Sequence, residues 1–95
     1  MKHYLILKLR ESEAVPQVAA KARSVLGHLP EELDGVRSVL AVRNCVPREE
    51  NHDLMIEMDF RDEEVLQEYL KHPRHKEFIA FAAPLVASKV TFDCL

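Results

Sequence analysis

The apolar residues near the start of the chain alternate in a way that predicts a β-strand. In "HYLILKL", residues 3–9, every second side chain falls on the same face. One face holds His3, Leu5, Leu7 and Leu9, and the other holds Tyr4, Ile6 and Lys8. Because both faces carry apolar side chains, we expect each of them to be at least partly covered.

A helical period replaces this alternation after Ser12. We expect Ser12 to cap a helix, with Pro16 near its start, because a serine oxygen can accept a backbone N–H of the first turn. Gly27 and Pro30 predict the end of this helix. Its apolar stripe consists of Val18, Ala22, Val25, Leu26 and Leu29.

Two more strands and a second helix follow. The segments "VRSVLAVRN", residues 36–44, and "DLMIEMDF", residues 53–60, are typical of strands joined by a polar loop. Asp62 then predicts the N-cap of a helix over residues 63–71. The apolar face of the strand before it holds Leu54, Ile56, Met58 and Phe60, and the stripe of the helix holds Val65, Leu66, Tyr69 and Leu70.

His72-Pro73 interrupts this helix, because proline disfavours the helical region for the residue before it but suits the first turn of a new helix. A short helix with Phe78 and Ile79 should therefore follow until Pro84. The segment "SKVTFDCL", residues 88–95, predicts a last strand.

The predicted order is βαββαβ, an α+β arrangement of the ferredoxin-like class in a single domain over residues 1–95. Its helices should cover one face of an antiparallel sheet and leave the other face bare. A second copy of the sheet is the simplest cover for such a patch, so we expect a homodimer. The residues expected on the bare face are Tyr4, Ile6, Val39, Ala41, Met55, Val90, Phe92 and Cys94.

Composition narrows the class of protein. The 95 residues carry 13 Lys and Arg against 16 Asp and Glu, and the basic residues are scattered, which argues against a nucleic-acid partner. No apolar run approaches the ~20 residues that cross a bilayer, so we expect no membrane association. Cys45 and Cys94 lack the spacing of a zinc or redox motif, which favours reduced thiols and a cytoplasmic protein.

Several segments together resemble one known family, the stress-responsive α/β-barrel (Dabb) domains, which include a plant olivetolic acid cyclase. The most specific is "YLKHPRHKEF", and "KHYLILKL", "DGVRSVLAVRN" and "VTFDCL" extend the likeness over nearly the whole chain. The resemblance implies a dimeric α/β barrel of two ferredoxin-like chains. It also implies a small pocket between each sheet and its own helices.

The same resemblance implies catalytic residues and a pocket wall. Tyr69, His75 and His3 fall where the cyclase has a tyrosine and two histidines around the reacting polyketide. Ala22 and Val25 stand where it has aromatic residues, so the cavity should differ in shape. The expected pocket residues are Leu5, Leu7, Ala22, Val25, Leu26, Leu54, Ile56 and Phe78.

The residue types fit acid–base chemistry without a cofactor. An imidazole at His75 can take a proton beside a carbonyl near neutral pH, Tyr69 can donate to the developing oxyanion, and His3 can position the substrate or His75. The alternative is structural, with a half-buried His3 and a Tyr69 hydroxyl bonded to backbone. We expect His72 to contact backbone at the junction, and we expect no metal site because no ligand spacing completes one.

Three functions stay open at this point. The first is a cofactor-independent lyase, cyclase or isomerase that acts on a small hydrophobic or aromatic molecule. The second is a non-catalytic stress-response protein that binds such a molecule, because one fold often hosts both. The third is a cofactorless monooxygenase of the dimeric α/β-barrel type. The absence of glycine-rich phosphate-binding motifs argues against nucleotide chemistry.

Overall fold

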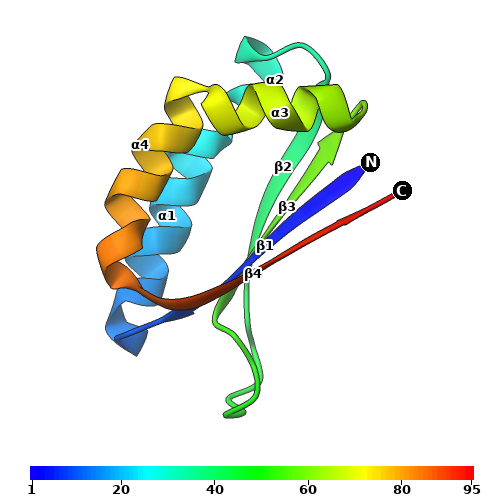
Figure 1. Cartoon of the computed structure of the whole chain (residues 1–95). Coiled ribbons are helices and arrows are strands. Elements are labelled where there is room, and N and C mark those ends of the chain that lie inside the picture. Colours follow the sequence, from blue (N-terminus) through cyan, green and yellow to red (C-terminus); the bar gives the residue numbers. More distant parts are fainter.

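The computed structural model describes residues 1–95 (Figure 1). Four strands, four α-helices and two 3₁₀ turns follow one another along the chain. They are β1 (Lys2–Leu9), η1 (Ser12–Ala14), α1 (Val15–Leu26), α2 (Leu29–Glu32), β2 (Val36–Arg43), β3 (Leu54–Phe60), α3 (Glu63–Lys71), α4 (Pro73–Ala82), η2 (Ala83–Leu85) and β4 (Val86–Cys94).

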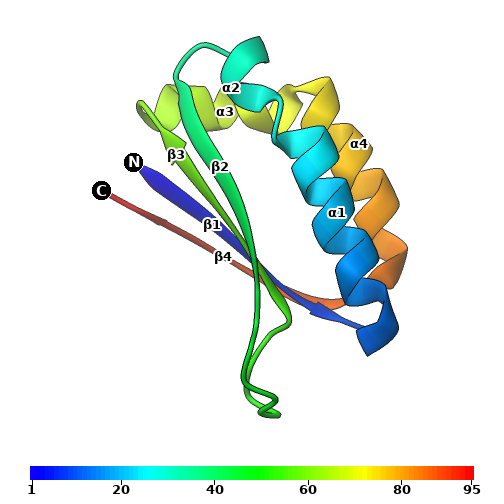
Figure 2. The same cartoon turned by 180° about the vertical axis from the view of Figure 1, so that it is seen from behind.

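The strands form one antiparallel sheet in the order β2-β3-β1-β4. All helices lie on one side of this sheet, with α1 and α4 side by side and α3 across one end (Figures 1 and 2). The predicted ferredoxin-like α+β fold is therefore confirmed. Its two layers leave the opposite face of the sheet uncovered.

The core lies between the sheet and the helices. Alternate residues of β1 and β3 point into it, as the sequence pattern predicts. The predicted stripes of α1 and α3 face them, except that Leu29 lies in α2 and Leu70 is 40% exposed. Asp62 caps α3 by accepting the Val65 N–H at 3.1 Å. The largest fully buried side chains are Tyr69, Phe60, Phe78, Leu26, Leu29, Leu54, Ile56 and Met58.

The prediction that Ser12 caps the first helix is wrong. Ser12 begins η1, and α1 continues directly from that turn at Val15. Its N-cap residue, Ala14, has helical dihedral angles and makes no side-chain cap bond. Since the turn already leads the backbone into the helix, no extended residue remains at its start to act as a cap.

The predicted faces of β2 are also wrong in part. Val39 and Ala41 pair with Met58 and Ile56 on the helix side, and the bare face carries Leu40 and Val42 instead. The cause is a register shift between Val36 and Ser38. An extra residue in a strand reverses the face of every side chain after it, and an unbroken alternation cannot predict this.

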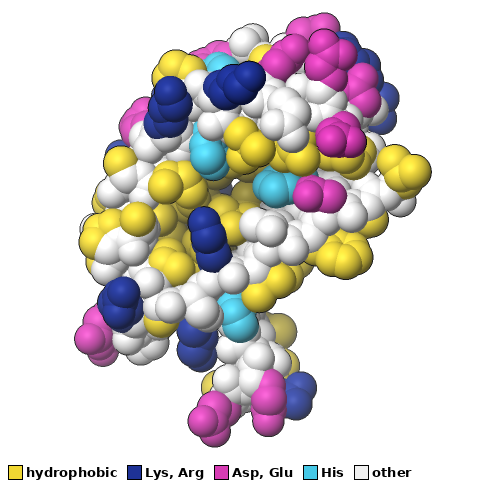
Figure 3. Space-filling model, viewed as in Figure 1, with side chains coloured by type: hydrophobic (Ala, Val, Ile, Leu, Met, Phe, Trp, Pro, Cys, Tyr) yellow, Lys and Arg dark blue, Asp and Glu magenta, His cyan; other side chains and the backbone are white.

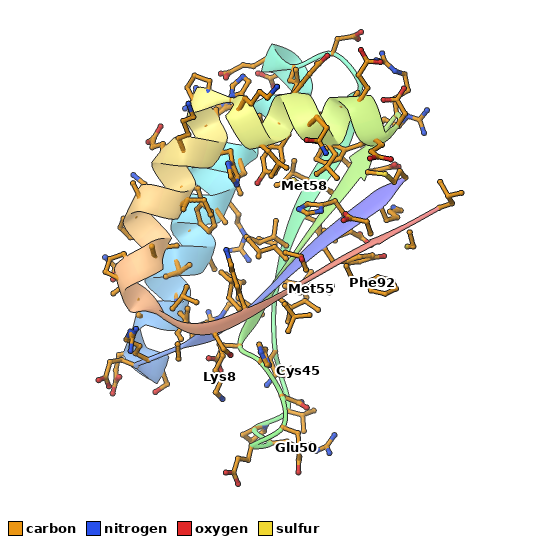
Figure 4. All side chains as sticks on the ribbon, in the orientation of Figure 1. Lys8, Cys45, Glu50, Met55, Met58 and Phe92 are labelled. Carbon is orange, nitrogen blue, oxygen red and sulfur yellow. The ribbon has the colours of Figure 1, made fainter.

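The bare face of the sheet carries a large apolar patch, with Lys2, Lys8, Glu57 and Asp59 on the same face. Its most exposed large side chains are Phe92 at 60%, Leu40 at 52% and Val90 at 49%. Figure 4 shows Met58 on the helix side of the sheet and Met55 and Phe92 on the opposite side. Soluble monomers rarely expose a continuous apolar surface of this kind.

Strand β4 has its polar residues on the helix side. Lys89, Thr91 and Asp93 pair with the inward-facing residues of β1, whereas Val90 and Phe92 pair with outward-facing ones. Every residue from Ala87 to Asp93 is exposed. The usual arrangement of an edge strand, apolar toward the core and polar outward, is thus reversed.

The remaining predictions about the chain concern thiols and membranes. Cys45, after β2, and Cys94, at the end of β4, are both free. No helix has the length and apolar character needed to cross a bilayer.

Candidate functional site

The junction of α3 and α4 fixes the direction of α4. His72 is extended, with ψ 142°, and Pro73 is the first residue of α4. The Nδ1 atom of His72 accepts the backbone N–H of Arg74 at 3.0 Å. This confirms the predicted break of the helix and the predicted contact of His72 with backbone.

An ion pair holds the first turn of α4 to α2. Arg74 donates two hydrogen bonds to the Glu32 carboxylate, at 3.0 and 2.7 Å. Such paired bonds fix the position of a guanidinium more firmly than a single contact does. The hydrogen bond from Arg74 lowers the pKa of Glu32, so the pair persists below the usual range of a glutamate.

The turn at Pro73 brings His75 against Tyr69. Their ring centroids lie 4.7 Å apart in an edge-on arrangement. Tyr69 also lies 6.0 Å from His3, and Phe60 stacks on His3 at 5.8 Å. The structure therefore brings together all three predicted catalytic residues, from β1, α3 and α4.

His75 presents one free nitrogen. Its Nδ1 lies 3.1 Å from the Leu70 carbonyl, which can only accept, so in the neutral ring Nδ1 carries the proton and Nε2 keeps its lone pair. Burial lowers the pKa of His75, and the nearby charges of His3 and Lys89 lower it further against the opposing bond to Leu70. The neutral form, which can act as a base, is favoured.

Tyr69 is a buried donor without a partner in the chain. The residue is only 1% exposed and its hydroxyl makes none of the hydrogen bonds in the structure, but no buried polar atom lacks a partner, so the hydroxyl oxygen is the accessible part of the side chain. The predicted alternative, a hydroxyl bonded to backbone, is therefore not found. Burial raises the pKa of Tyr69, so the hydroxyl stays protonated and able to donate.

His3 is held by a residue that the sequence analysis missed. Its Nδ1 lies 2.5 Å from a carboxylate oxygen of Asp93, directly opposite on β4. His3 itself is only 7% exposed. The signal for Asp93 was the alternation in "SKVTFDCL", which puts it on the face opposite to Val90 and Phe92, but the pairing of β4 with β1 is needed to match it with His3.

A cavity of about 240 Å³ lies between the inner face of the sheet and α4. Leu5, Leu7 and Phe78 line it, as expected of pocket residues. Eight of its ten lining residues are hydrophobic, and the two others are Ser88 and Lys89. The other expected pocket residues do not line it and are buried in the core instead: Ala22, Val25, Leu26, Leu54 and Ile56.

Tyr69, His75 and His3 are not in the lining of this cavity, but His3 and His75 neighbour two residues that are, Leu5 and Phe78. His3 is two residues before Leu5 on the inner face of β1, and His75 is one helical turn before Phe78 on α4. Figure 3 shows a hollow with apolar walls, histidine side chains at its rim and a basic side chain beside it. An apolar ligand could thus contact a base and a donor.

Potential metal ligands are not gathered anywhere in the structure. No three His, Cys, Asp or Glu side chains converge on one point. His72 and His75 use their Nδ1 atoms for different backbone partners, Arg74 N–H and Leu70 carbonyl.

Known structures share this fold. A dimeric ferredoxin-like protein of unknown function from Bacteroides fragilis NCTC 9343 superposes with a TM-score of 0.81 at 21% identity, over 98% of this chain and 94% of that one. A candidate antibiotic biosynthesis monooxygenase from Bacteroides thetaiotaomicron VPI-5482 gives 0.80 at 16%, over 100% and 87%. The hydroxynitrile lyase of Passiflora edulis gives 0.72 at 14%, over 96% and 87%.

At these identities the comparisons show a shared fold, and the activities named for those proteins are not assigned to this chain. No sequence among curated proteins matches the chain. The family is clear, however, because the stress responsive A/B barrel domain matches residues 1–95. The chain therefore belongs to the stress responsive A/B barrel domain (Dabb) family.

Proposed function

We propose that the protein is a small-molecule enzyme that works without a cofactor, as a lyase, cyclase or isomerase. The observation that carries this proposal is the pairing of Tyr69 with His75, whose ring centroids lie 4.7 Å apart, one helical turn from Phe78 in the lining of an apolar cavity. Tyr69 keeps a hydroxyl that no group of the chain uses, and because no buried polar atom of the chain lacks a partner, this hydroxyl is accessible to a ligand.

The roles follow from the geometry of each group. Nε2 of His75 takes a proton from a substrate carbon beside a carbonyl, and the electron pair of the broken C–H bond moves onto the carbonyl oxygen. Tyr69 donates its O–H to that oxygen as its negative charge develops. Asp93 fixes the ring of His3, which then positions the substrate.

The likeness to other proteins supports the fold needed for this chemistry. The hydroxynitrile lyase of Passiflora edulis has the same fold, and its name describes a carbon–carbon lyase. We also propose that Tyr69, His75 and His3 correspond to the tyrosine and the two histidines around the substrate of olivetolic acid cyclase. The substrate we propose is a small hydrophobic or aromatic molecule, since the cavity lies below the roughly 300–1,000 Å³ usual for drug-sized ligands.

The test compares two histidine variants on a panel of polyketide-like thioesters and aromatic ketones, which carry a C–H bond beside a carbonyl. We expect the wild-type protein to turn over at least one class and His75→Gln to lose the activity by about 10²-fold or more. The control is His28→Gln, because His28 is exposed at the start of α2, outside the cluster. Equal activity of His75→Gln and the wild type would remove His75 as the base.

Two alternatives are outcomes of the same panel. A compound that raises the melting temperature without being converted would favour a non-catalytic ligand-binding protein, because a ligand of the native state stabilises it. Oxygen uptake with phenolic compounds would favour a cofactorless monooxygenase. The second alternative is supported by the fold shared with the candidate monooxygenase from Bacteroides thetaiotaomicron.

We further propose that the chain forms a homodimer through the bare face of its sheet. Leu40, Val90 and Phe92 are 52%, 49% and 60% exposed there. The similar protein from Bacteroides fragilis is described as dimeric. Two such faces packed together would bury the apolar side of each sheet and leave both cavities on the outside, under their own helices.

A further inference from the structure

Lys89 is the one charged residue in the wall of an otherwise apolar cavity. It lies on the inner face of β4, opposite Leu7. Its ammonium group forms none of the ion pairs in the structure. The other two lysines on strands each have a carboxylate partner, Lys2 with Asp59 and Lys8 with Asp53. The ammonium group is therefore free to form an ion pair with a ligand.

The neighbouring acidic residue does not supply that partner. Asp93 is two positions farther along the same face of β4, and its carboxylate is engaged by His3. The only other polar residue of the lining is Ser88, which is uncharged. Lys89 is exposed, so water solvates its ammonium while the cavity is empty, and an anionic ligand would be attracted to the charge whereas an uncharged one would not.

We propose that the ligand of this cavity is a small apolar or aromatic carboxylic acid, bound as the carboxylate with its charge paired to Nζ of Lys89. The inference rests on the proposed function, because it names the substrate class of the same cavity. The apolar body of the acid packs against Leu5, Leu7 and Phe78.

A carboxylate fits this site better than a phosphate. A single ammonium balances one negative charge, whereas phosphate sites in proteins use several backbone N–H groups, a helix N-terminus or more than one cation. None of those groups is in the lining.

The pKa of His75 gives a second measurement that tests the proposal. The positive charge of Lys89 is near enough to contribute to the lowered pKa of His75, after burial and the charge of His3. A bound carboxylate would cancel that charge. The pKa of His75 should therefore rise when a carboxylate binds, and should not rise for a neutral analogue.

The experiment measures binding by NMR titration of the isotope-labelled protein, with benzoate and hexanoate as probes and benzamide and hexanamide as their neutral counterparts, at constant ionic strength. We expect the carboxylates to bind the wild type about tenfold more tightly than the amides, as a charge-assisted bond provides. Lys89→Met should lose this preference and Lys89→Arg should keep it. Lys76→Met, an exposed change on α4, is the control.

Three results would overturn the inference: no saturable binding of either carboxylate, equal affinity for acids and amides, or an unchanged preference in Lys89→Met. The proposed function fails separately. If carboxylates bind with the expected preference but no compound is turned over, the chemistry is wrong and the ligand class stands. If a neutral compound is turned over while acids gain nothing from Lys89, the enzyme stands and the ligand class is wrong.

Discussion

At the scale of single residues, removing the hydroxyl of Tyr69 should affect activity much more than stability. Its ring is buried in the core, but its oxygen has no partner in the chain. We expect Tyr69→Phe to change the free energy of unfolding by less than about 1 kcal/mol, because no hydrogen bond of the folded chain is lost. Turnover should fall by about 10²-fold, because the oxyanion loses its donor.

Chemical denaturation and steady-state kinetics of the same Tyr69→Phe sample check this prediction. Tyr4→Phe is a suitable control, since Tyr4 lies on the bare side of the sheet. A loss of stability as large as the loss of activity would instead assign the hydroxyl a structural role.

His75 should act as a base below the usual pH range of histidine. Burial lowers its pKa from the ordinary 6.5, so the neutral ring persists as the pH falls through that value. The acidic limb of the activity profile should therefore lie below pH 6.5, and activity should be lost only as the ring gains its proton. NMR titration of the His75 ring checks the midpoint, and a value at or above 6.5 would contradict the prediction.

The convergence of the three site residues could be predicted, but their surroundings could not. Tyr69, His75 and His3 were found from residue types and a family likeness, and the structure brings them together. Asp93 and Lys89 come from β4, whose partners depend on its register with β1. The predicted lining of the cavity included too many residues, because residues such as Ile56 fill the core between the layers. The cavity lies where α4 meets the edge of the sheet.

At the scale of elements, the cap at His72 sets where α4 begins. Its Nδ1 accepts the Arg74 N–H, which has no partner inside the helix. His72→Ala should lower the free energy of unfolding by about 1 kcal/mol. For a chain of this size the melting temperature should then fall by about 4–8 °C per kcal/mol.

His72→Asn is the matched variant for that measurement, because asparagine is a strong N-cap and should restore most of the lost stability. Thermal melts of the two variants check the prediction. Equal destabilisation by both substitutions would show that the imidazole acts through other contacts, such as its Nε2 atom 4.0 Å from Glu32.

The elements themselves were largely predictable. Strands β1 and β3 and helices α1, α3 and α4 follow directly from their apolar periods, and the break at Pro73 follows from proline stereochemistry. The start of α1 and the faces of β2 were not. Both depend on backbone irregularities, the turn before Val15 and the register shift after Val36, which leave no mark in the hydrophobic pattern.

At the scale of the whole molecule, the bare sheet face should set the oligomeric state. We expect a dimer in solution, and we expect Phe92→Lys to give a monomer because each copy would bury an unpaired lysine in the interface. Light scattering coupled to gel filtration checks both. Leu70→Lys, at another exposed apolar residue on α3, should leave the dimer intact, and a monomeric wild type at micromolar concentration would refute the interface.

The reversed polarity of β4 has a consequence for how the protein behaves when diluted. Within one chain this strand buries almost none of its side chains, yet it carries both Lys89 and Asp93. If only the second copy covers the apolar side of β4, this strand becomes less ordered when the dimer dissociates, and Lys89 and Asp93 with it. Specific activity should then decline as the protein concentration falls through the dissociation constant, so that catalysis itself reports association.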